Sequence, residues 1–183
     1  MQFNLHLSSL PELDNLKSLE NVEFNSSGEL FPGDYAPTIN EFEEIFVNIG
    51  NRIQRNEIYN GWKSHRRDLL KDGLNQEARI LLNGSYTTKK HSPNDVDLAV
   101  EVPITSESLN TADHNGPILR LLKGPEMKYI YNCDAYPIYI LPEDDPNYSV
   151  ITLAGVRYWT KWFARNRQNE YKGRVWARVR GLK

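Results

Sequence analysis

The segment DVDLAVEV, residues 95–102, is the feature that most restricts how this chain can fold. Apolar side chains alternate with polar ones along it, and this period of two residues predicts a strand with one buried face. Asp95 and Asp97 are two positions apart, so both carboxylates leave the same face of that strand. Because two close carboxylates repel each other strongly, the polar face of this strand needs a cation between them.

The periodicity of the remaining sequence predicts an α+β fold, in which flanking helices cover a mixed β-sheet. A capping box of Thr38 and Glu41 starts one helix over INEFEEIFV, and a longer helix runs from about Asn51 to about Lys71. The apolar runs ARILLNG and IYNCDAYPIYIL predict two more strands, and Pro137 places the second at an edge or a bulge. A helix over residues 149–167 and an alternating strand, GRVWARVR, follow.

Finer expectations concern the buried faces of the helices and the irregular segments. The inner face of the long helix is expected to carry Ile53, Ile58, Trp62 and Leu69 or Leu70, and that of the last helix Ile151, Leu153, Val156, Trp159 and Phe163. Residues 105–116 are expected to form a loop, and PILRLL a short helix. The chain is expected to be a single domain over residues 1–183, with residues 1–37 as an irregular N-terminal arm.

Charge is distributed unevenly along the chain. From residue 157 to the end, nine basic residues oppose only Glu170, so this basic tail carries +8 and residues 1–156 carry −10 of the net −2. Such a local field attracts phosphate or nucleic acid; the alternative is a solvated helix face and strand edge that balance the acidic body. The sequence has neither a secretory signal nor an apolar run near the roughly 20 residues that span a bilayer. Together with the lone Cys133, this predicts a cytoplasmic protein without membrane contact.

A glycine-serine turn precedes the carboxylate strand. Gly84 lets backbone N–H groups approach a phosphate closely, and Ser85 adds a hydroxyl donor; the alternative is an ordinary Asn-Gly turn that ends a strand. The full pattern is an apolar strand, Gly-Ser, nine residues, and then Asp, apolar, Asp, apolar. This pattern resembles the signature of the polymerase-β-like nucleotidyltransferase superfamily.

The resemblance implies a polymerase-β-like core and three acidic catalytic residues. Asp95 and Asp97 would hold Mg²⁺ or Mn²⁺, and Asp134, within YNCDAYPIYI, would complete the metal site and position or deprotonate an attacking hydroxyl. An unpaired carboxylate in so apolar a strand is costly to bury, which favours a metal or an acceptor hydroxyl as its partner. The alternative for Asp134 is a strand-end residue that backbone donors satisfy.

The implied reaction transfers a nucleoside monophosphate from a nucleoside triphosphate, ATP among them, to a hydroxyl of a protein, an RNA (tRNA included) or a small molecule. Gly84 and Ser85 would bind the triphosphate. Lys89, Lys90 or His91 would neutralise the departing pyrophosphate, unless these loop side chains are merely solvated. In the basic tail, Arg165, Arg167 and Lys172 would contact acceptor or nucleotide phosphates. Trp159, Trp162 and Phe163 are expected in the core rather than as base-stacking platforms.

A narrower resemblance extends over most of residues 28–179. The segments GELFPGDYAPTINEFEEIF, NGSYTTKKHSPNDVDLAVEV and YWTKWFARNRQNEYKGRVWARV resemble a family of small nucleotidyltransferase-like proteins of bacteria and mobile elements. Minimal members of the superfamily often resemble one half of a toxin–antitoxin or phage-defence pair, which implies a cognate toxin or antitoxin as partner. The alternative is a catalytically silent module of the same fold that binds a partner protein or RNA.

Overall fold

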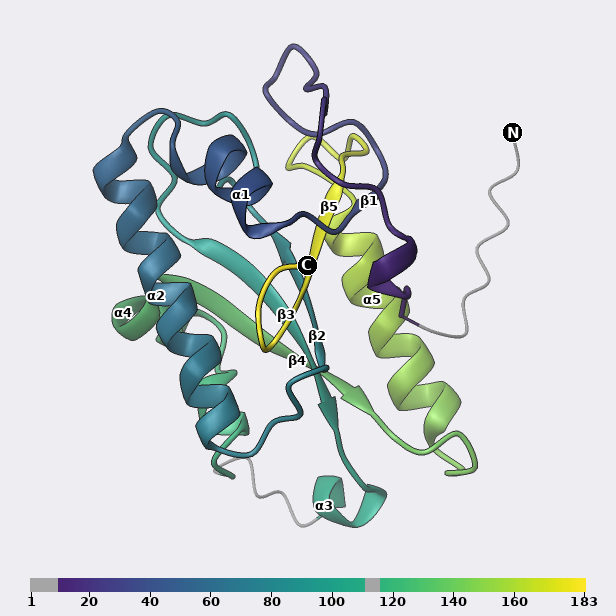
Figure 1. Cartoon of the computed structure of the whole chain (residues 1–183). Helices are drawn as coiled ribbons and strands as arrows, with labels where there is room; N and C mark the ends of the chain where they lie inside the picture. The colour runs from purple at the N-terminus through teal and green to yellow at the C-terminus, as the bar shows by residue number, and fades with distance from the viewer. Residues whose placement is uncertain (1–9, 111–115) are drawn as a thin grey trace, which may run out of the picture.

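A five-stranded mixed sheet forms the centre of the molecule (Figure 1). The structure is a computed structural model that describes residues 10–110 and 116–183. The strands of the sheet are β1 (Asp34–Tyr35), β2 (Arg79–Asn83), β3 (Val96–Pro103), β4 (Cys133–Ile140) and β5 (Arg174–Arg178), in the order β1-β5-β2-β3-β4. β2 is antiparallel to β3 and β5, whereas β3 is parallel to β4 and β1 to β5. The predicted mixed sheet with flanking helices is therefore confirmed, and Pro137 lies in the edge strand β4, as expected.

The helices begin near the predicted positions, but some are shorter. They are α1 (Ile39–Phe42), α2 (Arg52–Lys71), α3 (Ser106–Asn110), α4 (Lys128–Tyr131) and α5 (Ala154–Phe163), with π-helical turns at Glu43–Val47 and Ser149–Leu153. Thr38 and Glu41 form the predicted capping box before α1. The last helix ends at Phe163 rather than residue 167. PILRLL contains only a 3-10 turn, Leu119–Leu121, and α3 occupies part of the expected loop, of which residues 111–115 lie outside the described residues.

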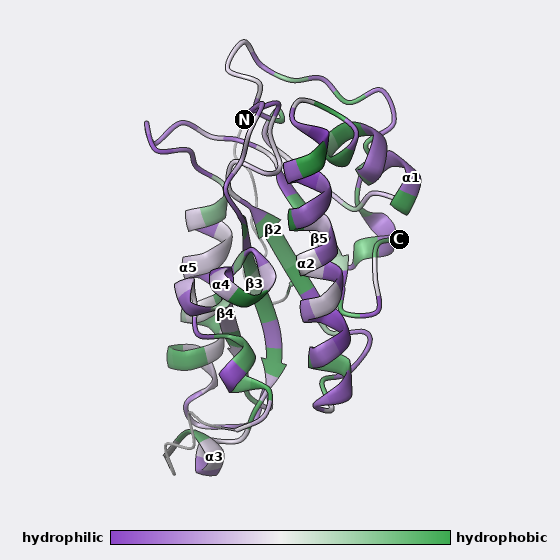
Figure 2. Cartoon of the chain, turned by 90° about the vertical axis from the view of Figure 1, so that its left-hand side faces the viewer, coloured by the Kyte–Doolittle hydropathy of each residue, from purple (hydrophilic) through white to green (hydrophobic). Residues whose placement is uncertain are grey.

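Buried apolar residues lie on both faces of the sheet. Its strands are largely green where they run between α2 and α5 in Figure 2. Ile80 and Leu82 of β2 point to the α2 side, whereas Leu81 between them points to the α5 side. This two-sided burial explains why β2 is an unbroken apolar run. On α2, Leu69 rather than Leu70 is buried. The expectation for Ile53 was wrong: it lies two and a half turns before the buried Trp62, on the opposite side of α2, and is 76% exposed.

Close backbone approach explains the glycine inside α2. A Cβ added to Gly61 would lie 2.1 Å from the carbonyl oxygen of Tyr131, so only glycine lets α2 approach α4 this closely. The described part of the N-terminal arm packs on the sheet through four buried leucines, Leu10, Leu13, Leu19 and Leu30, and it contributes β1. No helix among the described residues is both long and apolar enough to span a bilayer.

Candidate active site

Two of the predicted carboxylates meet across paired strands. Asp97 is the second residue of β3 and Asp134 the second of β4, and the parallel register sets these two residues opposite each other. Asp95 precedes β3 by one residue, and its charge acts on both of the others. The structure thus brings together the three aspartates that the sequence singled out.

Burial and mutual repulsion make this cluster electrostatically strained. Burial, and after it the charges of Asp95 and Asp134, raises the pKa of Asp97 from 3.8 to about 6, although Lys172 and Lys128 oppose the shift. Burial and the charge of Asp95 also raise the pKa of Asp134, against the effect of Lys128. The cluster therefore favours protons or another cation.

Asp134 has an oxygen without a partner. Its Oδ1 is buried and accepts no hydrogen bond from any described residue, which is contrary to the alternative of a strand-end aspartate satisfied by backbone donors. A buried, unpaired carboxylate oxygen costs free energy unless a ligand, a proton or a metal ion satisfies it. This oxygen therefore points to a ligand or a cation at this end of the sheet.

Lys128, which the sequence analysis missed, already engages one of the carboxylates. Its Nζ lies 2.5 Å from Oδ2 of Asp95, and this contact raises the pKa of the lysine. Nothing in the local sequence indicates the pairing, because Lys128 begins α4 and meets Asp95 only through the tertiary fold.

The cluster fits a divalent metal ion in part. Carboxylate oxygens are the ligands that Mg²⁺ prefers, and the unpartnered Asp134 oxygen and the raised pKa of Asp97 both favour a cation. However, no three His, Cys, Asp or Glu side chains in the described part of the chain are arranged to hold a metal ion, and Asp95 is bound by Lys128 instead. A metal ion at this cluster would therefore compete with the Lys128 ammonium group for the Asp95 carboxylate.

The Gly-Ser turn lies directly against the carboxylate strand. Gly84 follows β2 with φ of +81°, and a Cβ there would lie 1.8 Å from Oδ2 of Asp97, so conformation and space both require glycine. The backbone N–H and the hydroxyl of Ser85 donate to no acceptor within residues 10–110 and 116–183. Two free donors beside a carboxylate cluster suit a phosphate next to a cation.

A buried arginine holds the loop that follows this turn. The guanidinium of Arg55, on α2, is fully buried and donates to the carbonyl oxygens of Phe46, Tyr86, Thr88 and Lys90 at 2.5–3.0 Å. Three of these carbonyls belong to residues 86–90, so one side chain fixes the course of the loop. A sequence signal existed, since Arg55 precedes the inner-face residue Ile58 by three positions and therefore shares its face.

The predicted basic residues are distributed differently from expectation. Lys172 lies 3.5 Å from the carbonyl oxygen of Gly84 and is 8% exposed; burial lowers its pKa, while Glu29 and Asp97 oppose this. Lys89 lies over the ring of Phe24, 4.6 Å from its centroid, in the N-terminal arm. Lys90 and His91 are exposed. Lys172 is thus the basic-tail residue at the turn, and Lys89 is engaged elsewhere.

The arginines of the basic tail that lie on and after β5 form ion pairs with acidic residues of the body. Arg174 pairs with Asp34, whereas Arg178 and Arg180 both pair with Glu77. For these residues the structure supports the alternative that the strand balances the acidic body. Arg165 donates to the Asn169 carbonyl and to the Tyr171 hydroxyl, both at 2.6 Å, so it folds back on its own turn.

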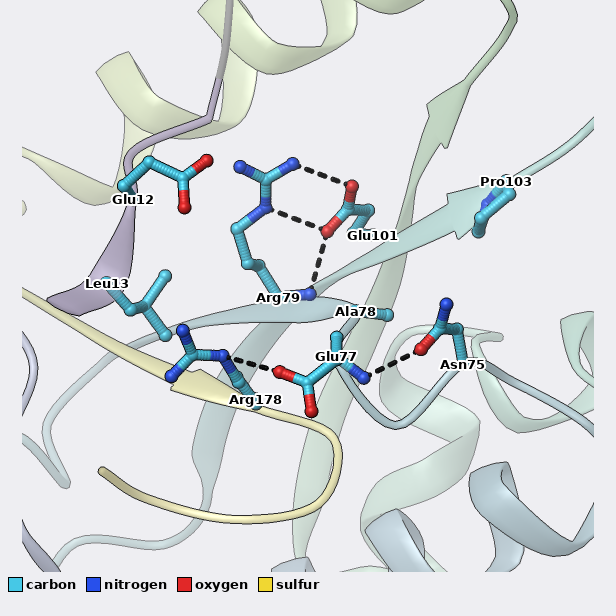
Figure 3. A pocket seen from close by; sticks show the side chains of 9 residues that line it. All are labelled: Glu12, Leu13, Asn75, Glu77, Ala78, Arg79, Glu101, Pro103 and Arg178. Atoms are coloured by element: carbon cyan, nitrogen blue, oxygen red, sulfur yellow. Dashed lines mark hydrogen bonds and ion pairs between the residues drawn. The ribbon is translucent and has the colours of Figure 1, made fainter.

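A cleft of about 300 Å³ lies away from the carboxylates, beside the first residue of β2 and the last residues of β3 and β5 (Figure 3). Arg79 makes a two-pronged ion pair with Glu101 there and donates to the carbonyl of Leu10, while Arg178 pairs with Glu77. Its guanidinium groups are therefore already neutralised. Residues of the N-terminal arm, among them Glu12, line this cleft together with residues of the sheet.

The chain is thus a mixed α/β protein with a half-buried carboxylate cluster beside a glycine turn. Residues 22–178 match the model of a family of unknown function, DUF6932, and the chain belongs to this family. No curated protein and no solved structure matches the chain. The description of this family names no function, so the resemblance to nucleotidyltransferases stays a prediction.

Proposed function

We propose that this chain has a polymerase-β-like nucleotidyltransferase core and transfers a nucleoside monophosphate from a nucleoside triphosphate to a hydroxyl, with Mg²⁺ or Mn²⁺ as cofactor. One observation carries the proposal: Asp97 and Asp134 meet across paired strands beside Gly84, and one Asp134 oxygen is buried without a partner. Well-packed apolar residues would often serve stability as well as buried charges or better. A strained acidic cluster is therefore better explained by chemistry than by stability.

Each part of the site has a place in this reaction. A metal ion held by Asp95, Asp97 and Asp134 would neutralise charge on the phosphate oxygens. The free N–H and hydroxyl of Ser85 would donate to the triphosphate. The acceptor oxygen would bond to the α-phosphorus as pyrophosphate leaves, and Asp134 would accept its proton. A carboxyl with a raised pKa suits that last task near neutral pH.

A second candidate function is a catalytically silent module that binds a partner protein or RNA, including a cognate toxin or antitoxin. The contact between Lys128 and Asp95 favours it, because an ammonium group neutralises the cluster without a metal ion. The absence, in the described residues, of an assembled metal-binding group points the same way. In such a protein the aspartates would be structural.

Label transfer separates the two candidates. Purified protein is incubated with a lysate that contains total RNA, with α-³²P-labelled ATP, CTP, GTP or UTP, and with Mg²⁺ or Mn²⁺. The test variant is Asp97→Asn, which keeps the shape of the side chain, and the matched control is Asp144→Asn in an exposed turn. We expect label on an acceptor with the wild type and the control but not with the Asp97 variant.

The sensitivity of the labelled product to ribonuclease or to protease then gives the class of the acceptor. No label with any nucleotide, or equal label with the Asp97 variant, would contradict the transferase. A pull-down with the tagged wild-type chain would then identify the partner of the silent module.

A further inference from the structure

Two large aromatic side chains project from α5 into solvent. Trp162 was expected in the core, but it is 64% exposed, and Tyr158, one turn before it, is 55% exposed. Their rings are parallel within 11°, with centroids 6.1 Å apart. Phe163 is buried and Trp159 partly buried, as expected, because these two pack against the sheet. Tyr158 and Trp162 are therefore not needed to pack α5 against the sheet.

The aromatic contacts continue inward towards the carboxylates. Tyr158 packs edge-on against Trp159 at 5.1 Å, and Trp159 packs on Tyr136 at 4.9 Å. Tyr136 is two residues after Asp134 on β4 and thus on the same face of the sheet. Burial and the charges of Asp134 and Asp97 raise the pKa of the Tyr136 phenol. A continuous series of rings thus joins the outer face of α5 to the candidate active site.

The same helix carries positive charge without compensation. Residues 146–169 contain four basic residues and no acidic one. Arg157 and Lys161 are exposed one turn apart, each directly before an exposed ring, and neither forms an ion pair with any described residue. This differs from β5, where the arginines pair with carboxylates. Arg157 and Lys161 are therefore available for the phosphate binding that the sequence predicts for the basic tail.

We infer that Arg157, Tyr158, Lys161 and Trp162, together the α5 ridge, bind single-stranded nucleic acid. Single strands are held by aromatic rings on which unpaired bases stack and by cations that follow the phosphates, and this ridge alternates the two. A duplex hides its base faces and could use only the cations. Binding itself needs no catalysis; that the strand is the acceptor of the transfer rests on the function proposed above.

Fluorescence anisotropy tests the ridge directly. The probe is a fluorescein-labelled 12-nucleotide RNA without internal pairing, titrated with the full chain in EDTA and without nucleotide, beside the same RNA as a duplex. The test variant is Tyr158→Ala/Trp162→Ala, whose side chains are exposed enough for the fold to tolerate their loss. The matched control is Tyr129→Ala, which removes a 92% exposed aromatic from α4.

We expect the wild type and the Tyr129 variant to bind the single strand more tightly than the duplex, and the double variant to bind it at least about tenfold more weakly. Lys161→Ala should lower the slope of log affinity against log salt by about 0.7. Absence of binding by the wild type, equal binding by the double variant, or preference for the duplex would each overturn the inference. These outcomes are independent of label transfer, because the assay contains neither nucleotide nor metal.

Discussion

Replacement of Asp97 by asparagine should make the metal-free protein more stable at neutral pH. Asn keeps the shape of the side chain but carries no charge, so it removes both the cost of burying a carboxylate and the repulsion from Asp95 and Asp134. A substitution in an ordinary buried polar position would destabilise the fold instead. The sign of the effect therefore tests whether the carboxylate cluster is strained.

The magnitude follows from the pKa of Asp97. The folded carboxyl holds its proton up to about pH 6, whereas the unfolded one releases it near 3.8, so between these values the folded state binds more protons. Folding stability of the wild type therefore falls as pH rises through this window, by about 3 kcal/mol in total. The Asp97→Asn variant lacks this loss. Its advantage should approach about 3 kcal/mol at pH 7.5 and shrink below about 1 kcal/mol at pH 4.

Urea denaturation in EDTA at pH 4 and pH 7.5 measures both values. Asp144→Asn, in an exposed turn, is the control, and its free energy of unfolding should match that of the wild type within about 0.5 kcal/mol at either pH. Addition of Mg²⁺ should stabilise the wild type and not the Asp97 variant, if the proposed metal site is correct. A less stable Asp97 variant at pH 7.5, or an equal difference at both pH values, would refute the electrostatic reasoning.

Three further substitutions test the backbone around the site by urea denaturation. Gly84→Ala should cost about 2–4 kcal/mol of folding stability and abolish any label transfer. The control Gly73→Ala, also at positive φ but in open space, should cost only about 1 kcal/mol. Equal costs would refute the close approach of Gly84 to Asp97. Gly61→Ala should destabilise the protein despite the higher helix propensity of alanine. The control Gly155→Ala, with nothing within 4 Å, should be neutral or stabilising by up to about 1 kcal/mol. A stabilising change at Gly61 would contradict the close contact between α2 and α4. Arg55→Met should cost at least about 3 kcal/mol and expose residues 84–91 to protease, and a resistant loop would show that another group holds it.

Sequence patterns predicted the parts of this protein that depend on local interactions. Thr38 and Glu41 specify the start of a helix because their side chains cap its free N–H groups within four residues. The alternation around Asp97 specifies which side chains share a face, because the period of a strand is fixed at two. The turn at Gly84 could also be predicted, since it follows directly from an apolar strand. These features need no knowledge of distant residues.

Helical spacing explains two exposed apolar residues once the inner side of each helix is known. Ile53 lies two and a half turns before the buried Trp62, so it is on the opposite side of α2 and is exposed. Trp162 lies about 120° around α5 from the buried Val156 and is also exposed. Only the tertiary structure shows which side of each helix faces the sheet.

Pairing between distant residues was decided by the tertiary structure alone. The parallel register sets Asp134 opposite Asp97, Lys128 contacts Asp95, and Arg55 donates to the carbonyls of residues 86–90. Each of these contacts joins residues more than 30 positions apart. Such contacts depend on how strands align and helices dock, and neither composition nor spacing encodes them one residue at a time. The sequence by itself therefore determined that carboxylates and a glycine turn would share one end of a sheet. The fold decided which cations and which unpaired oxygens accompany them.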